Sequence, residues 1–238
     1  MKVAALLTGR GNSTFKDKNI QIILGHAVLY YPAHAAKMAR TISEYYCSSD
    51  DIAILAEAER EGYKRIQRPA ELALPTSQHV DAILHALETI RGNGELPDIL
   101  VVLLANNVTI KSEWIDRCVE MMQADMTLSA VVPVYQDNDH HPLRAKIPDG
   151  NGRLQMYEKG VTGRISTNRQ DLPTCFFLAH NFWVLNTWTL IDGFENGQQP
   201  WSFMGNEIGY FEISESIDIH KETDLMLAQD WIEKNYTD

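Results

Sequence analysis

Runs of apolar residues alternate along the chain with segments whose apolar positions recur every three or four residues. Val3–Leu7 and Ile99–Leu104 are uninterrupted apolar runs, which predict buried strands of a parallel sheet. The run Ile52–Ala56 predicts another strand, and Val80–Ile90 has the spacing of an amphipathic helix. Strands that alternate with helices in this way predict an α/β protein with an open, mostly parallel twisted sheet and helices on both faces.

The alternation stops near residue 134. From Tyr135 to about Pro173 the chain is polar and rich in Asp, Asn, Gly, Arg and His, and apolar runs resume only afterwards. We therefore predict a single domain over residues 1–238 with a protruding polar insertion at about 135–173. The other predicted elements are helices over Val28–Met38, Ile115–Met122 (capped by Ser112) and Leu225–Ile232, and strands over Leu128–Val134, Phe176–Leu185 and Ile208–Ile213.

The composition is that of an ordinary globular protein. Hydrophobic residues occupy 45% of the 238 positions and charged residues 22%, which excludes a disordered or low-complexity chain. The three cysteines lie far apart with no CxxC pair, so we expect neither a disulfide framework nor a zinc site. No run approaches the roughly 18 apolar residues of a membrane span. Together these features predict a cytoplasmic protein.

The distribution of charge narrows the choice of ligand. A net charge of −11 argues against a nucleic-acid or membrane-surface binder, which would present a basic face. Residues 1–20 nevertheless carry four basic side chains and one acidic side chain, net +3, around the loop Gly9–Ser13. This loop is neither a Walker loop nor a GxGxxG fingerprint. Either its backbone N–H groups and Arg10 bind phosphate, or it is a plain glycine turn among solvated lysines.

Six short motifs follow one another along the chain. They are Arg10-Gly11-Asn12-Ser13 with Lys18-Asn19-Ile20, Arg68-Pro69-Ala70-Glu71-Leu72-Ala73, His85-Ala86-Leu87, His141-Pro142, Arg169-Gln170-Asp171-Leu172-Pro173 and Ile217-Asp218-Ile219. In order and spacing they resemble the motifs of the cytidylyltransferases that activate 3-deoxy-2-keto sugar acids, the CMP-sialic acid synthetase family. The resemblance covers nearly the whole chain, and it implies a Rossmann-like nucleotidyltransferase fold.

The resemblance also implies an activity: transfer of CMP from CTP to a 3-deoxy-2-keto sugar acid of the nonulosonic type, with release of pyrophosphate and with Mg²⁺, or Mn²⁺, as cofactor. Such a reaction needs cations beside the phosphates and oxygen ligands for the metal. We therefore predict catalytic roles for Arg10, Lys18 and Asp218. The other predicted residues are Arg10, Gly11, Asn12, Ser13, Lys18 and Arg68 for the nucleotide, Lys146, Arg169, Gln170 and Asn181 for the acidic sugar, and Asp218 and His220 for the metal. In the resembling family the polar insertion packs against a second subunit, which predicts a homodimer.

Three segments depart from the family pattern. Leu104–Lys111 replaces a QPTSPLR-like sequence, Ala179-His180-Asn181 replaces an NG-A sequence, and His220 replaces a second aspartate. These departures favour an unusual acceptor, but they also leave open a degenerate paralogue that binds nucleotide without turnover. A nucleotide-sugar-dependent glycosyltransferase is a further alternative, although Ala105-Asn106-Asn107 stands where an Asp-x-Asp motif would be needed.

Three of the predicted site residues also have simpler structural explanations. Arg169 could be a surface arginine at a dimer contact. Asp218 precedes the last predicted helix and could cap it, since aspartate is a preferred capping residue. His220 could point away from the metal, which Asp218, water and the CTP phosphates would then hold between them.

Overall fold

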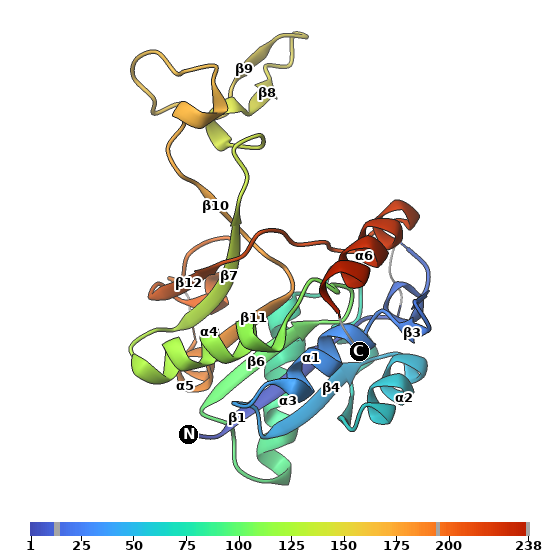
Figure 1. Ribbon diagram of the computed structural model, residues 1–238. Helices are drawn as coiled ribbons and strands as arrows, with labels where there is room; N and C mark the ends of the chain where they lie inside the picture. Colours follow the sequence, from blue (N-terminus) through green and yellow to red (C-terminus); the bar gives the residue numbers. More distant parts are fainter. Residues whose placement is uncertain (12–14, 194–195, 237–238) are drawn as a thin grey trace.

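The computed structural model describes residues 1–11, 15–193 and 196–236, and an eight-stranded sheet forms its centre (Figure 1). The strand order is β10-β7-β11-β6-β1-β4-β5, and β12 also pairs with β7. The strands are β1 (Val3–Thr8), β4 (Glu44–Ser49), β5 (Lys64–Gln67), β6 (Ile99–Leu104), β7 (Ala130–Gln136), β10 (Phe176–Leu178), β11 (Phe182–Asn186) and β12 (Ile208–Glu212). The predicted open α/β sheet is confirmed.

The order of the strands creates a point where the connections reverse direction. From β1 the chain proceeds to the parallel strands β4 and β5 on one side, and then crosses back to β6 on the other side of β1. β11 pairs antiparallel with both β6 and β7, so the sheet is mixed beyond β6. In open α/β sheets, ligands bind beyond the carboxyl ends of the strands at such a reversal. Here this place is the edge where β1 and β6 end.

Alternate residues of β1 enter the two halves of the core. Val3, Ala5 and Leu7 pack among α1, α2 and α4, whereas Ala4 and Leu6 pack on the opposite face with α3 and α5. Because both faces are covered, the strand is apolar at every position up to Thr8. The helices are α1 (Tyr30–Met38), α2 (Ile52–Arg60), α3 (His79–Asn93), α4 (Ser112–Ala124), α5 (Thr187–Asp192) and α6 (Glu222–Asn235).

A third, smaller core holds the last helix. Trp231 and Ile232 of α6 pack against Ile23 and Val28 in and beside the hairpin of β2 (Ile22–Ile23) and β3 (His26–Ala27). Ile219 is fully buried in the same cluster. The chain before α6 is thereby fixed at the carboxyl edge of the sheet.

One predicted strand is a helix. Ile52–Ala56 belongs to α2, and the Asp51 side chain caps this helix by accepting a hydrogen bond of 2.7 Å from the Ala53 backbone N–H. The strand of this region is β4, in which Tyr46 and Cys47 face opposite halves of the core. Five apolar residues do not distinguish a short strand from a buried helical turn. The polar and aromatic residues of β4 also lack the apolar run that marks β1.

Other differences concern the ends of elements. Phe176–Leu185 forms two strands, β10 and β11, instead of one. Ser112 is the first residue of α4, and Lys111 occupies the capping position without a side-chain hydrogen bond. The predicted helices at Val80–Ile90 and Leu225–Ile232 and the predicted strand at Ile99–Leu104 are confirmed within a few residues.

Residues 137–175 form a protrusion that we call the arm. It holds the short strands β8 (Lys146–Pro148) and β9 (Leu154–Met156), which pair antiparallel, and the single turns η3 (Pro142–Arg144) and η4 (Arg169–Asp171). Figure 1 shows the arm projecting beyond the ends of β7 and β10, away from the helices that cover the sheet. The polar insertion expected at about 135–173 is this arm.

Two further sequence expectations can be compared with the structure. Cys47, Cys118 and Cys175 are all free, and the first two are buried. Within the described residues, no helix combines the length and the apolar character that crossing a membrane requires.

Candidate functional site

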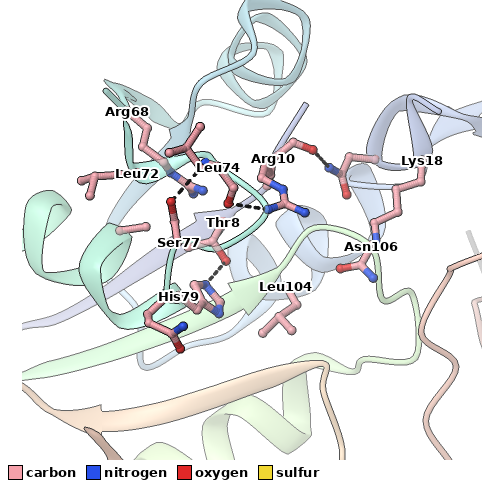
Figure 2. A pocket seen from close by; sticks show the side chains of 14 residues that line it. Thr8, Arg10, Lys18, Arg68, Leu72, Leu74, Ser77, His79, Leu104 and Asn106 are labelled. Atoms are coloured by element: carbon pink, nitrogen blue, oxygen red, sulfur yellow. Dashed lines mark hydrogen bonds between the residues drawn. The ribbon is translucent and has the colours of Figure 1, made fainter. Parts of the chain in front are cut away.

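A cavity of about 230 Å³ opens at the carboxyl edge of the sheet (Figure 2). Its walls come from the ends of β1, β5 and β6 and from the start of α3, so the reversal point of the sheet is its floor. The lining residues are Thr8, Gly9, Arg10, Lys18, Asn19, Arg68, Leu72, Leu74, Ser77, Gln78, His79, Ala82, Leu104 and Asn106. Apolar side chains therefore form part of the wall, and three cations form another part.

The glycines after β1 are required by close packing. A Cβ at Gly11 would lie 2.5 Å from a carboxylate oxygen of Asp51, and a Cβ at Gly9 would lie 3.2 Å from the Ala105 Cβ. The Gly11 N–H donates a hydrogen bond of 3.1 Å to the Asp50 carboxylate. The loop is thus held against the start of α2. The predicted ligand residues Asn12 and Ser13 lie outside the described residues.

Two arginines enter the cavity with fixed orientations. The Arg10 guanidinium donates to the Leu74 carbonyl at 2.8 Å, and the Arg10 carbonyl accepts from the Asn19 amide at 3.1 Å. Arg68 is 6% exposed, and its Nε and Nη2 donate to the side chain and carbonyl of Ser48 at 3.2 and 2.8 Å. The structure brings both arginines to one cavity, as the sequence predicted for residues that bind one ligand.

Lys18 is the third cation of the cavity. Burial lowers the pKa of its ammonium group, and the nearby positive charge of Arg10 lowers it further, whereas Asp218 opposes both effects. A lysine with this environment gains from an anionic ligand, because the ligand would compensate a charge that has lost part of its hydration. Arg10, Lys18 and Arg68 therefore make the cavity suited to a polyphosphate.

Asp218 lies beside the cavity, next to the loop that follows β6. Its backbone forms a bridge with Asn107, the Asn106 amide donates to Oδ1, and His220 Nε2 lies 2.9 Å from Oδ2. Burial raises the pKa of this carboxyl, although His220 and Lys18 oppose the shift. His220 thus faces Asp218 in this structure, and its role toward a metal ion stays a prediction.

Asp218 does not cap α6 either. Lys221 occupies the capping position, and the Asp224 carboxylate accepts the backbone N–H groups of His220 and Lys221 at 2.8 and 3.0 Å. Asp218 is therefore free of the structural role that its position suggested.

The donor set fits a Mg²⁺ ion held mainly by its substrate. Asp218 offers one carboxylate, with His220 beside it, and the described residues contain no cluster of three His, Cys, Asp or Glu side chains that could hold a metal. Mg²⁺ commonly takes one or two protein carboxylates and completes its shell with phosphates and water. Asp218 satisfies that minimum.

The predicted acceptor residues are not gathered at this cavity. Lys146, Arg169 and Gln170 are exposed on the arm and none of them lines the cavity; Arg169 instead pairs with Asp139 at 2.7 Å. Asn181 is fully buried, and its amide bonds to the Thr109 carbonyl and the Phe182 N–H. In this conformation Asn181 supports the fold and presents no exposed atom to a sugar.

His79 is a cavity residue that the sequence prediction missed. His79, the first residue of α3, lies 2.9 Å from the Thr8 hydroxyl through its Nε2 (Figure 2). The residue occurs six positions after the Arg68–Ala73 motif and opens the following helix. That position at a helix start, close in sequence to a ligand motif, was the available signal.

No family model matches the chain. Solved structures do: a CMP:2-keto-3-deoxy-manno-octonic acid synthetase complexed with CTP superposes with a TM-score of 0.71 at 12% identity, covering 99% of this chain and 100% of the other. The 4-diphosphocytidyl-2C-methyl-D-erythritol synthase of Anaerococcus prevotii has a TM-score of 0.65 at 11% identity, covering 98% and 96%. The chain therefore shares the fold of these two solved structures.

A third solved structure agrees with the first two. The 2-C-methyl-D-erythritol 4-phosphate cytidylyltransferase of Thermus thermophilus has a TM-score of 0.62 at 16% identity, covering 98% of this chain and 100% of the other. The nucleotidyltransferase fold implied by the sequence motifs is thereby confirmed over almost the entire length. Since identities are this low, the likeness concerns the architecture alone.

Proposed function

We propose that this protein is a CTP-dependent cytidylyltransferase, which transfers CMP from CTP to the hydroxyl group of an acceptor. The observation that carries the proposal is the convergence of Arg10, Lys18 and Arg68 on one cavity at the reversal point of a cytidylyltransferase fold. A structural neighbour that was solved as a complex with CTP supports the choice of nucleotide.

Each of these three cations has a role in the proposed reaction. The acceptor oxygen attacks the α-phosphorus of CTP, the bond from that phosphorus to the bridging oxygen breaks, pyrophosphate leaves, and the hydroxyl proton passes to water. Negative charge shifts onto the leaving oxygens, so Arg10 and Lys18 stabilise the transition state more than the ground state. Arg68, fixed by Ser48, orients the nucleotide.

Mg²⁺ is the cofactor of the proposal, with Asp218 and His220 as its protein ligands. The ion would neutralise phosphate charge and act as a Lewis acid when bound. His220 in place of a carboxylate removes one negative charge from the site, and its nitrogen suits Mn²⁺ better than Mg²⁺. We therefore expect His220→Asp to raise the ratio of the rate in Mg²⁺ to the rate in Mn²⁺. An unchanged ratio would show that His220 is not a ligand.

For the acceptor we propose a 3-deoxy-2-keto sugar acid, on the strength of the motif resemblance. A carboxylate acceptor needs a basic partner, and the basic residues predicted for it lie on the arm, separate from the cavity of the same chain. The proposal therefore includes a homodimer in which Lys146 or Arg169 approaches the cavity of a second copy.

The first experiment measures CTP affinity and pyrophosphate release separately. Calorimetry should detect CTP binding, and Arg10→Ala should weaken it by about 1.5–3 kcal/mol, because a charge-assisted hydrogen bond is lost. Unchanged CTP affinity in this variant would remove Arg10 from the nucleotide site. Equal affinity for ATP would contradict the preference for cytidine.

Pyrophosphate release is then assayed with CTP and a panel of 2-keto-3-deoxy acids, with neutral sugars as controls. Release with an acid alone supports the whole proposal, and release with a neutral sugar alone overturns the acceptor class. CTP binding without turnover on any acceptor would favour a protein that only binds nucleotide. One observation favours that second candidate: both oxygens of Asp218 already have partners, Asn106 and His220.

A further inference from the structure

We infer that His79 is a specificity-determining residue of the cavity, whose Nδ1 accepts a hydrogen bond from the exocyclic amino group of cytosine. The inference rests on the proposed CTP-dependent function and adds a residue that discriminates CTP from UTP. Three observations support it: the direction of the hydrogen bond between Thr8 and His79, the neutral charge state of the imidazole, and the residues that surround the ring in the cavity.

The tautomer of His79 follows from the Thr8 hydroxyl. That hydroxyl has a single proton and lies 3.0 Å from the Leu103 carbonyl, which can only accept. Thr8 therefore donates to Leu103 and accepts from His79 Nε2, 2.9 Å away. With the proton on Nε2, Nδ1 of the neutral ring carries a lone pair.

The ring stays neutral at physiological pH. Burial lowers the pKa of His79 to about 4, and the positive charge of Arg68 and the nearby His180 act in the same direction. The ring also packs against Trp183, with 5.2 Å between the ring centroids, which limits its rotation. Its lone pair is thus both present and held in one direction.

Nδ1 has no hydrogen-bond partner among the residues that the structure describes, although His79 lines the cavity. Figure 2 shows one ring nitrogen bonded to Thr8 and the other turned away from it. The lone pair of Nδ1 repels phosphate oxygens, so the part of a ligand that contacts Nδ1 must be a hydrogen-bond donor. Leu72, Leu74 and Ala82 line the cavity with His79 and suit the face of a base.

Arg68 supplies the complementary group. Its Nε and Nη2 are used by Ser48, whereas Nη1 has no partner within the described part of the chain. Arg68 Nη1 as a donor and His79 Nδ1 as an acceptor together match cytosine, which carries a carbonyl oxygen and an amino group. Uracil carries a second carbonyl in place of the amino group, and its oxygen would face the lone pair of Nδ1. A site strongly rejects a ligand that leaves its polar groups without hydrogen-bond partners.

The test compares the affinities for CTP and UTP by calorimetry in four proteins: the wild type, His79→Phe, Thr8→Val and His85→Gln. His79→Phe keeps a ring against Trp183 but removes the acceptor. It should weaken CTP binding about tenfold and leave UTP binding within about twofold. Thr8→Val removes the hydroxyl that accepts from His79 Nε2, so the ring proton can move to Nδ1. This variant should lower the ratio of CTP affinity to UTP affinity by about threefold. His85 lies on the same helix and does not line the cavity, so His85→Gln should keep the wild-type ratio.

The outcomes separate this inference from the proposed function. If the wild type binds no CTP, the proposed function fails. If CTP binds but His79→Phe leaves the ratio of the two affinities unchanged, or lowers both affinities equally, His79 does not determine specificity and the inference alone is overturned. A ¹⁵N spectrum gives an independent check: the Nδ1 resonance of His79 should be that of an unprotonated nitrogen and should shift when CTP, but not UTP, is added. A protonated Nδ1 would overturn the tautomer and with it the inference.

Discussion

The cavity and the arm differ in the burial and the partners of their basic side chains. At the cavity, Arg10 and Arg68 donate to backbone carbonyls at 2.8 Å, and Arg68 is almost fully buried. On the arm, Arg144 and Arg169 are exposed and both pair with the exposed Asp139, at 3.2 and 2.7 Å, and Arg144 also donates to two neighbouring carbonyls within the arm. Exposed pairs of this kind contribute little to stability. The cavity thus holds its arginines through contacts with the backbone of the body, whereas the arm holds its arginines through an exposed carboxylate of its own.

The apolar residues of the cavity region and of the arm also differ in their exposure to solvent. Leu103 of β6 is fully buried, whereas Leu154 and Tyr157 of the arm are 72% and 60% exposed. The arm pairs only two strands of three residues each, too few for an independent core. We expect the arm to gain its order from a partner and the body to be stable alone.

The largest expected effect is therefore on assembly. The double variant Leu154→Glu, Tyr157→Glu places charges on the exposed apolar surface of the arm and should convert the proposed dimer to a monomer. Sedimentation at micromolar concentration measures the mass. Ile22→Glu, at a residue of the body that is 66% exposed, is the matched control and should keep the mass of the wild type. A wild type that sediments as a monomer would contradict the dimer.

One leucine-to-alanine variant in each region tests how much the body and the arm contribute to the free energy of unfolding. Leu103→Ala should lower the free energy of unfolding by about 3 kcal/mol, because it leaves a cavity in a fully packed sheet. Leu154→Ala should change the free energy of unfolding by less than about 0.5 kcal/mol when measured on the monomer. Urea unfolding of both variants provides the comparison. Equal losses would show that the arm is part of the main core.

Variants of two lysines in one segment, Lys18 and Lys16, test whether a charge in the cavity matters more than a charge on the surface. Lys18→Ala should lower kcat/KM about 100-fold, roughly 2.7 kcal/mol, because Lys18 lines the cavity and, in the proposed reaction, stabilises the leaving phosphates. Lys16 is exposed and does not line the cavity, so Lys16→Ala should change kcat/KM by less than about threefold. Similar losses in the two variants would mean that the segment acts only through its net charge.

The fold class could be predicted from the sequence because strands that are buried on both faces are uninterrupted runs of apolar residues. β1 up to Leu7 and the whole of β6 are apolar, since helices cover both faces of the sheet. The helix α2 was mistaken for a strand because its first turn is equally apolar. Its capping residue, Asp51, was the feature that distinguishes the two.

The sequence predicted cavity residues where a motif contains them, and it did not predict roles that depend on a specific side-chain contact between distant segments. Arg10, Lys18 and Arg68 occur in motifs, and the structure brings them to one cavity. The roles of Asn181 and His79 depend on pairings between distant segments, with Thr109 and Thr8 respectively. A sequence pattern does not contain such pairings, so a buried amide was taken for a ligand and a ligand candidate was overlooked.

The smallest expected effect concerns the carboxylate beside the cavity. The folded state raises the pKa of Asp218 by burial, so the folded protein binds its proton more tightly than the unfolded chain. The contribution of Asp218 to stability is therefore full below the unfolded pKa and is lost as pH rises through the folded pKa. Asp218→Asn should gain stability over the wild type as pH rises from about 4 to 7, by no more than about 1 kcal/mol. Asp125, whose pKa is lowered by hydrogen bonds from Thr127, is the matched control: Asp125→Asn should lose stability relative to the wild type over the same range. Thermal melts at several pH values measure both variants, and equal signs would contradict the assignment of a buried, destabilising charge to Asp218.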